Sequence, residues 1–63
     1  MRTDMFDVIY TYISMEMGCD YDTFIDIMDT KCSYWEHQFI MLSFMSDRDD
    51  KIRKSKQIFN NYK

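Results

Sequence analysis

Apolar residues recur along most of this chain at intervals of three or four, the spacing of one face of an α-helix. In residues 4–17 the polar positions Asp7, Thr11 and Ser14 form a narrow stripe, and most other positions are apolar. The segment is also rich in β-branched and aromatic residues, which suits a strand. Because the polar spacing persists over about three turns, we predict a helix, capped by Thr3 or Asp4. A helix this apolar must bury two faces or bind another molecule.

Gly18, the only glycine in the chain, marks the expected end of this first helix. Glycine adopts the left-handed backbone of a helix C-terminus without steric cost. The segment 23–26 (Thr-Phe-Ile-Asp) resembles a capping box, with aspartate in place of glutamate. We therefore predict a second helix over residues 23–31 that buries Phe24, Ile25 and Met28.

Ser33 to Glu36 is the strongest local signal in the sequence. It is a complete S-x-x-E capping box directly before an apolar run. We predict a third helix over residues 34–46, central in the fold because residues 40–42 are apolar on all sides. Its expected buried stripe consists of Trp35, Phe39, Leu42 and Met45, broadened by Tyr34, Met41 and Phe44.

The last segment predicts a fourth helix over residues 48–60, with acidic residues at its start and basic ones further in, as the helix dipole favours. Its apolar stripe is thin, comprising Ile52, Phe59 and Tyr62. No glycine or proline lies near residues 46–50, so the sequence leaves open a turn or one continuous helix. The predicted fold is all-α, one small domain over residues 1–63 with three to four short helices, which a second copy of the chain would complete.

The composition of the chain favours an interaction protein. A domain of only 63 residues buries about 60% of its unfolded surface, and its stability is marginal without a disulfide set, a metal or a partner. Two cysteines are too few for a disulfide framework. Seven methionines and eleven aromatic residues are typical of adaptable binding faces. The scarcity of alanine, glycine, proline and arginine indicates an AT-rich genome, such as that of a phage, another virus or a low-GC bacterium.

No cofactor, metal or catalytic site is expected from the sequence. Cys19, Cys32 and His37 lack the close pairing of zinc ligands. One glycine cannot build a phosphate-binding loop, and acids near helix starts are explained by capping. The chain shows no apolar run of transmembrane length and no apolar signal segment at its start. We therefore expect an intracellular protein that is not an enzyme.

Charge is unevenly distributed, with a net charge of −8 over residues 1–50 and +5 over residues 51–63. An acidic face can steer a protein toward a basic target, and Tyr and Trp dominate binding hot spots. The predicted partner-binding residues are Tyr10, Asp20, Asp22, Asp26, Asp29, Tyr34 and Trp35. An alternative use of the chain is contact with nucleic-acid phosphates through Lys51, Arg53, Lys54 and Lys56.

These observations predict a non-enzymatic binding module or inhibitor, in the manner of small viral or phage accessory proteins. Its methionine- and aromatic-rich helical face, flanked by acidic residues, would mask a site on a larger protein. Self-association through the first and third helices is equally compatible with the pattern. The alternative is a small dimeric regulator associated with nucleic acid through residues 51–56.

Overall fold

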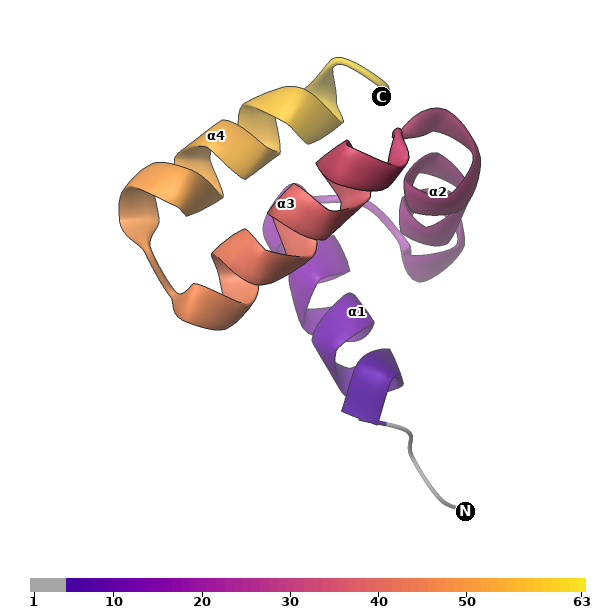
Figure 1. Cartoon of the computed structure of the whole chain (residues 1–63). Coiled ribbons are helices and arrows are strands. Elements are labelled where there is room, and N and C mark those ends of the chain that lie inside the picture. The colour runs from indigo at the N-terminus through magenta and orange to yellow at the C-terminus, as the bar shows by residue number, and fades with distance from the viewer. Residues whose placement is uncertain (1–4) are drawn as a thin grey trace.

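The computed structural model describes residues 5–63, and all regular structure in this range is helical (Figure 1). The helices are α1 (Met5–Met17), α2 (Tyr21–Asp26), α3 (Tyr34–Ser46) and α4 (Asp49–Asn60), and α2 continues directly into one π-helical turn, η1 (Ile27–Lys31). The all-α prediction is therefore confirmed, and the strand alternative for the first segment is wrong. The predicted caps Thr3 and Asp4 lie outside the described residues.

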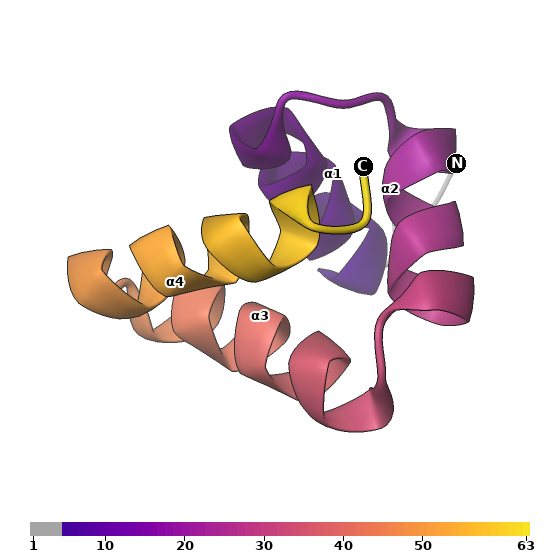
Figure 2. The ribbon, with the colours of Figure 1, turned by 90° about the horizontal axis from the view of Figure 1, so that it is seen from above.

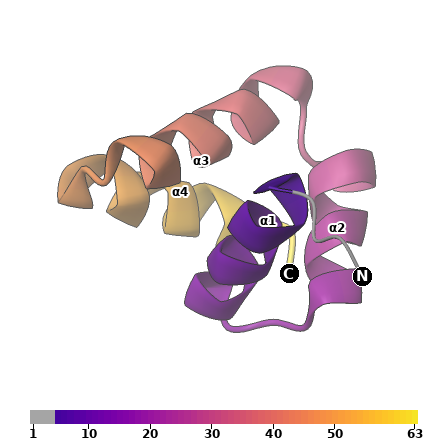
Figure 3. The same ribbon diagram turned by 90° about the horizontal axis from the view of Figure 1, so that it is seen from below.

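The four helices surround a common core rather than forming a parallel bundle. Helices α3 and α4 pack as a hairpin, and α1 crosses α3 while also packing against α2 (Figures 1 and 2). Seen from below, α1 is nearest the viewer and α4 is on the far side (Figure 3). The radius of gyration, 11.1 Å, is close to the value of about 10.6 Å expected for a folded chain of this length. The helices formed by residues 5–63 are too short to cross a bilayer as apolar spans.

Every helix contributes to one core of nine buried hydrophobic side chains. At its centre the ring of Phe24 on α2 stacks on that of Phe59 on α4, with centroids 5.6 Å apart. Both rings are fully buried, so they join helices that are distant in sequence. The remaining core residues are Ile13, Met17, Ile27, Met28, Ile40, Met41 and Phe44.

Gly18 ends α1 as the sequence predicts. Its φ is +73°. The two hydrogen bonds of a Schellman cap are present, from Gly18 N–H to Met15 O (3.1 Å) and from Cys19 N–H to Ser14 O (3.2 Å). The Lys63 ammonium donates to Met17 O at 2.8 Å. The C-terminal residue thereby satisfies one more carbonyl at the end of α1.

The start of α2 differs from the sequence prediction. The helix begins at Tyr21, two residues before the predicted position, because Asp20 is the N-cap and accepts a hydrogen bond from the Thr23 amide at 2.9 Å. Aspartate is the stronger N-cap, and Thr23 occupies the third helical position. The expected burial of Ile25 is also only partial, and Ile27 takes its place in the core.

The capping box of α3 forms as predicted, with Ser33 and Glu36 each accepting from the other's backbone amide. The open question at residues 46–50 is decided by Asp47. Its backbone is left-handed (φ 55°), the one positive φ outside glycine in the described chain. Asp47 therefore ends α3 and turns the chain back into α4, as glycine does for α1.

The buried face of α3 agrees with the predicted one only in part. The predicted stripe is exposed at Trp35, Leu42 and Met45 (78%, 61% and 60% of each residue) and half-buried at Phe39. Of the residues expected to broaden the stripe, Met41 and Phe44 are buried and Tyr34 is exposed, and the core side also carries Ile40 and Ser43. Because α3 carries apolar residues on all its sides, its pattern does not indicate which face packs against the core. The neighbouring helices α1 and α4 decide it.

The side of α1 that faces the core also differs from the one that its polar pattern predicts. Ser14, within the predicted polar stripe, is buried, and its hydroxyl donates to Thr11 O at 2.8 Å. A serine hydroxyl that bonds its own helix can be buried without an unsatisfied donor. Ile13 and Met17 enter the core, and other apolar residues of α1 face outward.

Candidate interaction surface

The outer side of α3 carries the most exposed large hydrophobic side chain of the described chain, Trp35. Trp35, Phe39 and Leu42 follow each other at intervals of four and three residues and share one side of the helix. We call these three residues the α3 outer face. The Tyr34 ring meets the Trp35 ring edge to face, with centroids 5.4 Å apart. The two aromatic residues thus form an exposed pair at the start of the helix.

The base of this aromatic pair is held by Glu36. Its carboxylate accepts from the Ser33 amide at 2.8 Å and from the Tyr62 hydroxyl at 2.7 Å and 2.8 Å. These hydrogen bonds, that from Ser33 first, hold the pKa of Glu36 below its ordinary value. The same contact raises the pKa of Tyr62. Trp35 therefore projects from a helix start tied to the C-terminal segment.

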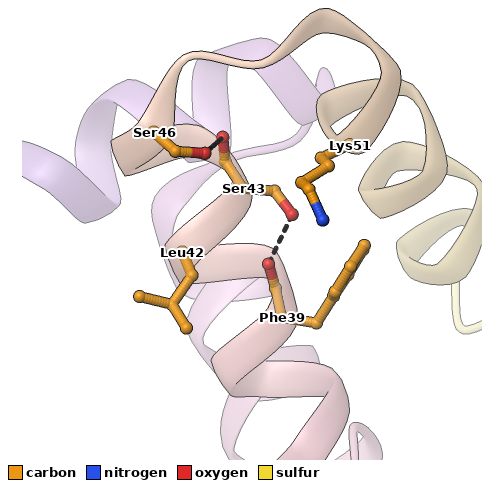
Figure 4. Close-up of a pocket in the computed structure, with 5 residues that line it drawn as sticks. All are labelled: Phe39, Leu42, Ser43, Ser46 and Lys51. Atoms are coloured by element: carbon orange, nitrogen blue, oxygen red, sulfur yellow. Dashed lines mark hydrogen bonds between the residues drawn. The ribbon is translucent and has the colours of Figure 1, made fainter.

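An open pocket of about 280 Å³ lies between the end of α3 and the start of α4. Phe39, Leu42, Ser43, Ser46 and Lys51 line it (Figure 4). The Lys51 ammonium lies 5.9 Å from the centre of the Phe39 ring, in cation–π range. The hydroxyls of Ser43 and Ser46 bond to carbonyls of α3. The pocket therefore offers an apolar wall and one cation, which suits an apolar side chain with an acidic neighbour.

The predicted acidic residues lie along the outer side of α2 and η1. Asp22, Asp26 and Asp29 are exposed and spaced four and three residues apart, so we call them the acidic stripe. Asp20 is exposed too, but it is the N-cap, and hydrogen bonds from Thr23 hold its pKa below the ordinary value. Asp29 is five residues before Tyr34, so at most about 18 Å of chain separates them. Figure 2 shows α2 and the start of α3 at the same end of the molecule.

Tyr10 is less exposed than the other predicted binding residues. It is half-buried, and its ring contacts Phe24 of α2 and His37 of α3, with centroids 6.0 Å and 6.4 Å apart. This ring joins three helices. Its contribution is to packing more than to an open face.

The four cations of residues 51–56 do not form one patch. Lys51 and Lys54 are three residues apart and share one side of α4, whereas Arg53 and Lys56 share the other side. Lys51 lies over Phe39, and Lys56 pairs with Glu16 of α1 at 3.6 Å. Two of the four cations, Lys51 and Lys56, are thus in contact with groups of other helices.

The metal-ligating side chains of residues 5–63 are not clustered. No three His, Cys, Asp or Glu side chains in this range are arranged to hold a metal ion. Cys19 and Cys32 are free thiols. Burial raises the pKa of both, which lowers the fraction of thiolate, the nucleophilic form.

Two parts of the surface were missed by the sequence analysis. One is the pocket, whose residues come from two helices. The other is a row of exposed residues on α1, Met5, Val8, Tyr12 and Met15, which we call the α1 outer face. Their spacing of three, four and three residues was a detectable signal, but the polar stripe of α1 suggested a different solvent side.

Comparison with known proteins gives no relative: no protein-family model, no curated protein and no solved structure matches this chain. The interpretation of these surfaces therefore depends on their own chemistry.

Proposed function

We propose that this chain is a non-enzymatic binding protein that masks a site on a larger protein with the α3 outer face. The observation that carries the proposal is the exposure of Trp35, at 78%. Exposing so large an apolar ring to water costs free energy, and that cost is recovered when a partner covers it. Trp and Tyr are enriched among the residues that dominate binding energy.

The partner's chemistry is suggested by the groups around Trp35. The acidic stripe at one end of the α3 outer face favours a target with basic side chains. The pocket at the other end accepts an apolar side chain between Phe39 and Leu42. The complementary surface is therefore an amphipathic segment, apolar along one side and basic at the end that meets α2.

A site-specific photo-crosslinker tests this proposal in the cells that make the chain. We expect a crosslink to a larger protein from position 42, in the α3 outer face, and none from position 57. Gln57 is an exposed polar residue of α4 and is the matched control. Trp35→Ala combined with the position-42 crosslinker should abolish the adduct. No adduct at position 42, or an equal one at position 57, would overturn the proposal.

Intrinsic fluorescence tests the chemistry of the partner, since Trp35 is the only tryptophan. The probe is a model helix with leucines along one side and lysines at one end only, and the same peptide with glutamates in place of the lysines is its control. We expect the lysine peptide to shift the Trp35 emission to shorter wavelength with saturation. An equal response to the glutamate peptide would contradict the role assigned to the acidic stripe.

The nucleic-acid alternative receives less support from the geometry, because its four cations lie on two sides of α4. A salt titration distinguishes the two functions. Phosphate binding weakens steeply with salt, whereas binding through the α3 outer face depends on apolar contact.

A further inference from the structure

The α1 outer face is a second apolar surface, on a different helix from Trp35. Met5, Val8, Tyr12 and Met15 are 73%, 56%, 49% and 72% exposed. Tyr12 connects this row to α3, since its ring meets that of Phe44 edge to face at 6.2 Å. Phe44 precedes Met45, which is also exposed. The apolar surface thus extends from α1 toward the end of α3.

The spacing of the α1 outer face is symmetrical. Reading the chain in either direction, its four residues are three, four and three positions apart. If the α1 helices of two copies pack antiparallel, Met5 of each copy lies opposite Met15 of the other. Val8 of each copy likewise lies opposite Tyr12 of the other. A small side chain then faces a large one, and flexible methionines meet at the ends, where they can adapt to the gap. Such alternation is how facing helices interdigitate.

The charged residues of α1 do not oppose this arrangement. Asp7 and Glu16 are the only charged positions in Met5–Met17. The Tyr21 hydroxyl donates to Asp7 at 3.1 Å, and Lys56 pairs with Glu16 at 3.6 Å. Both carboxylates therefore have partners on α2 or α4, at the flanks of the row. The face between them carries no charge that would select a charged partner.

The exposed area is adequate for a dimer. With roughly 150–250 Å² for a fully exposed large side chain, the four residues of the row and Met45 offer on the order of 600 Å² of apolar surface. A standard interface buries about 800 Å² per partner, including its polar rim. A chain of 63 residues also has a small core and gains the most from such burial.

We propose that the α1 outer face is covered by the same face of a second copy of this chain, forming a two-fold symmetric dimer with antiparallel α1 helices. A two-fold interface uses the same patch on both subunits. The spacing of three, four and three residues meets this requirement, because it is the same in both chain directions and every residue of the row has a counterpart on the other copy. The dimer leaves the α3 outer face, including Trp35, available for the target proposed above.

Sedimentation equilibrium on the full chain tests this proposal. We expect a dimer at micromolar concentration that persists at high salt, since the contact is apolar. Val8→Glu and Met15→Glu should each raise the dimer dissociation constant about 100-fold or more, because two unpaired charges are buried per dimer. Gln57→Glu adds the same charge to an exposed position of α4 and should leave the dimer intact, as should Trp35→Ala. A monomeric wild-type chain, or glutamate variants that still dimerise, would overturn the proposal.

A crosslinking experiment tests the register without relying on destabilising variants. In a chain carrying Cys19→Ser and Cys32→Ser, one population receives Val8→Cys and another Tyr12→Cys. Mild oxidation of the mixture should give the 8-to-12 disulfide, because these positions face each other. Either population alone should crosslink poorly, since like positions are offset by about 6 Å along the helix and a disulfide needs Cα atoms within about 7 Å. Equal crosslinking in all three samples would contradict the antiparallel register. Loss of the dimer would leave the crosslink of the α3 outer face unaffected, so the two proposals fail separately.

Discussion

The Tyr62 hydroxyl donates to both carboxylate oxygens of Glu36, at 2.7 Å and 2.8 Å. This contact joins residues 26 positions apart and connects the end of the chain to the first turn of α3. Glu36 also completes the capping box with Ser33. The Glu36 carboxylate thus links the first turn of α3 to the C-terminal segment. Its sequence neighbour Trp35 belongs to the proposed binding face.

This contact predicts the response of the fold to pH. Because the folded-state pKa of Glu36 is lowered from its ordinary value of 4.5, its contribution to stability is complete above that value and is lost as the pH falls below it. Tyr62 behaves oppositely: its raised pKa means that its contribution is lost as the pH rises above 10. Thermal melts from about pH 2.5 to about pH 11, a range that spans both ordinary values, measure both limits.

Tyr62→Phe provides the matched variant. It keeps the ring and removes the hydroxyl, so the pKa of Glu36 should move up toward its ordinary value and the acid transition should begin at higher pH. NMR titration of the Glu36 carboxylate measures this shift directly. An unchanged titration would mean that the Tyr62 contact does not form in solution.

Alanine substitutions on α3 should distinguish its buried face from its exposed face. Ile40 is fully buried, so Ile40→Ala should reduce the free energy of unfolding by about 2–5 kcal/mol. Trp35→Ala removes a larger side chain, but it should change this free energy by less than about 0.5 kcal/mol because the ring is exposed. Urea unfolding followed by circular dichroism compares them. The reverse order of effects would show that α3 packs through the face predicted from sequence.

Ser55 predicts a stabilising substitution. It is fully buried, and its hydroxyl has no hydrogen-bond partner within the described residues. Ser55→Ala should therefore raise the free energy of unfolding by about 1 kcal/mol. Ser43 is the control: it is equally buried, but its hydroxyl donates to Phe39 O at 2.6 Å. Ser43→Ala should gain less than Ser55→Ala, and equal gains would indicate that the Ser55 hydroxyl finds a partner in solution.

The two left-handed residues predict opposite effects. A non-glycine residue in this conformation costs roughly 1–2 kcal/mol. Asp47→Gly should relieve part of that cost and stabilise the fold by about 1 kcal/mol. Gly18→Ala should lose about 1–2 kcal/mol from the backbone alone, since the nearest atom to an added Cβ, Lys63 Nζ, is at an ordinary contact distance of 3.9 Å. Thermal unfolding measures both, and a destabilising Asp47→Gly would show that the aspartate side chain contributes more than its backbone costs.

The elements of this fold were largely predictable because their signals are local. Gly18 ends α1, and Ser33 with Glu36 starts α3, since each acts on backbone groups within a few residues. The start of α2 was misassigned because Asp20 and Thr23 are both good capping residues, and a short helix leaves little periodicity to choose between them. The binding role of Tyr10, Tyr34 and Trp35 stays a prediction: Tyr34 and Trp35 are exposed, whereas Tyr10 is half-buried.

By itself, the sequence determined the all-α class, the capping box of α3 and the end of α1, since these depend on local geometry and on hydrophobic period. Only the tertiary structure decided which face of each helix meets the core. Residues 40–42 are apolar on every side of α3, so burial of either face would satisfy the hydrophobic effect, which has no direction. The packing of α4 against α3 and the contact of Tyr12 on α1 with Phe44 select one face, and Trp35 and Leu42 are thereby left outside.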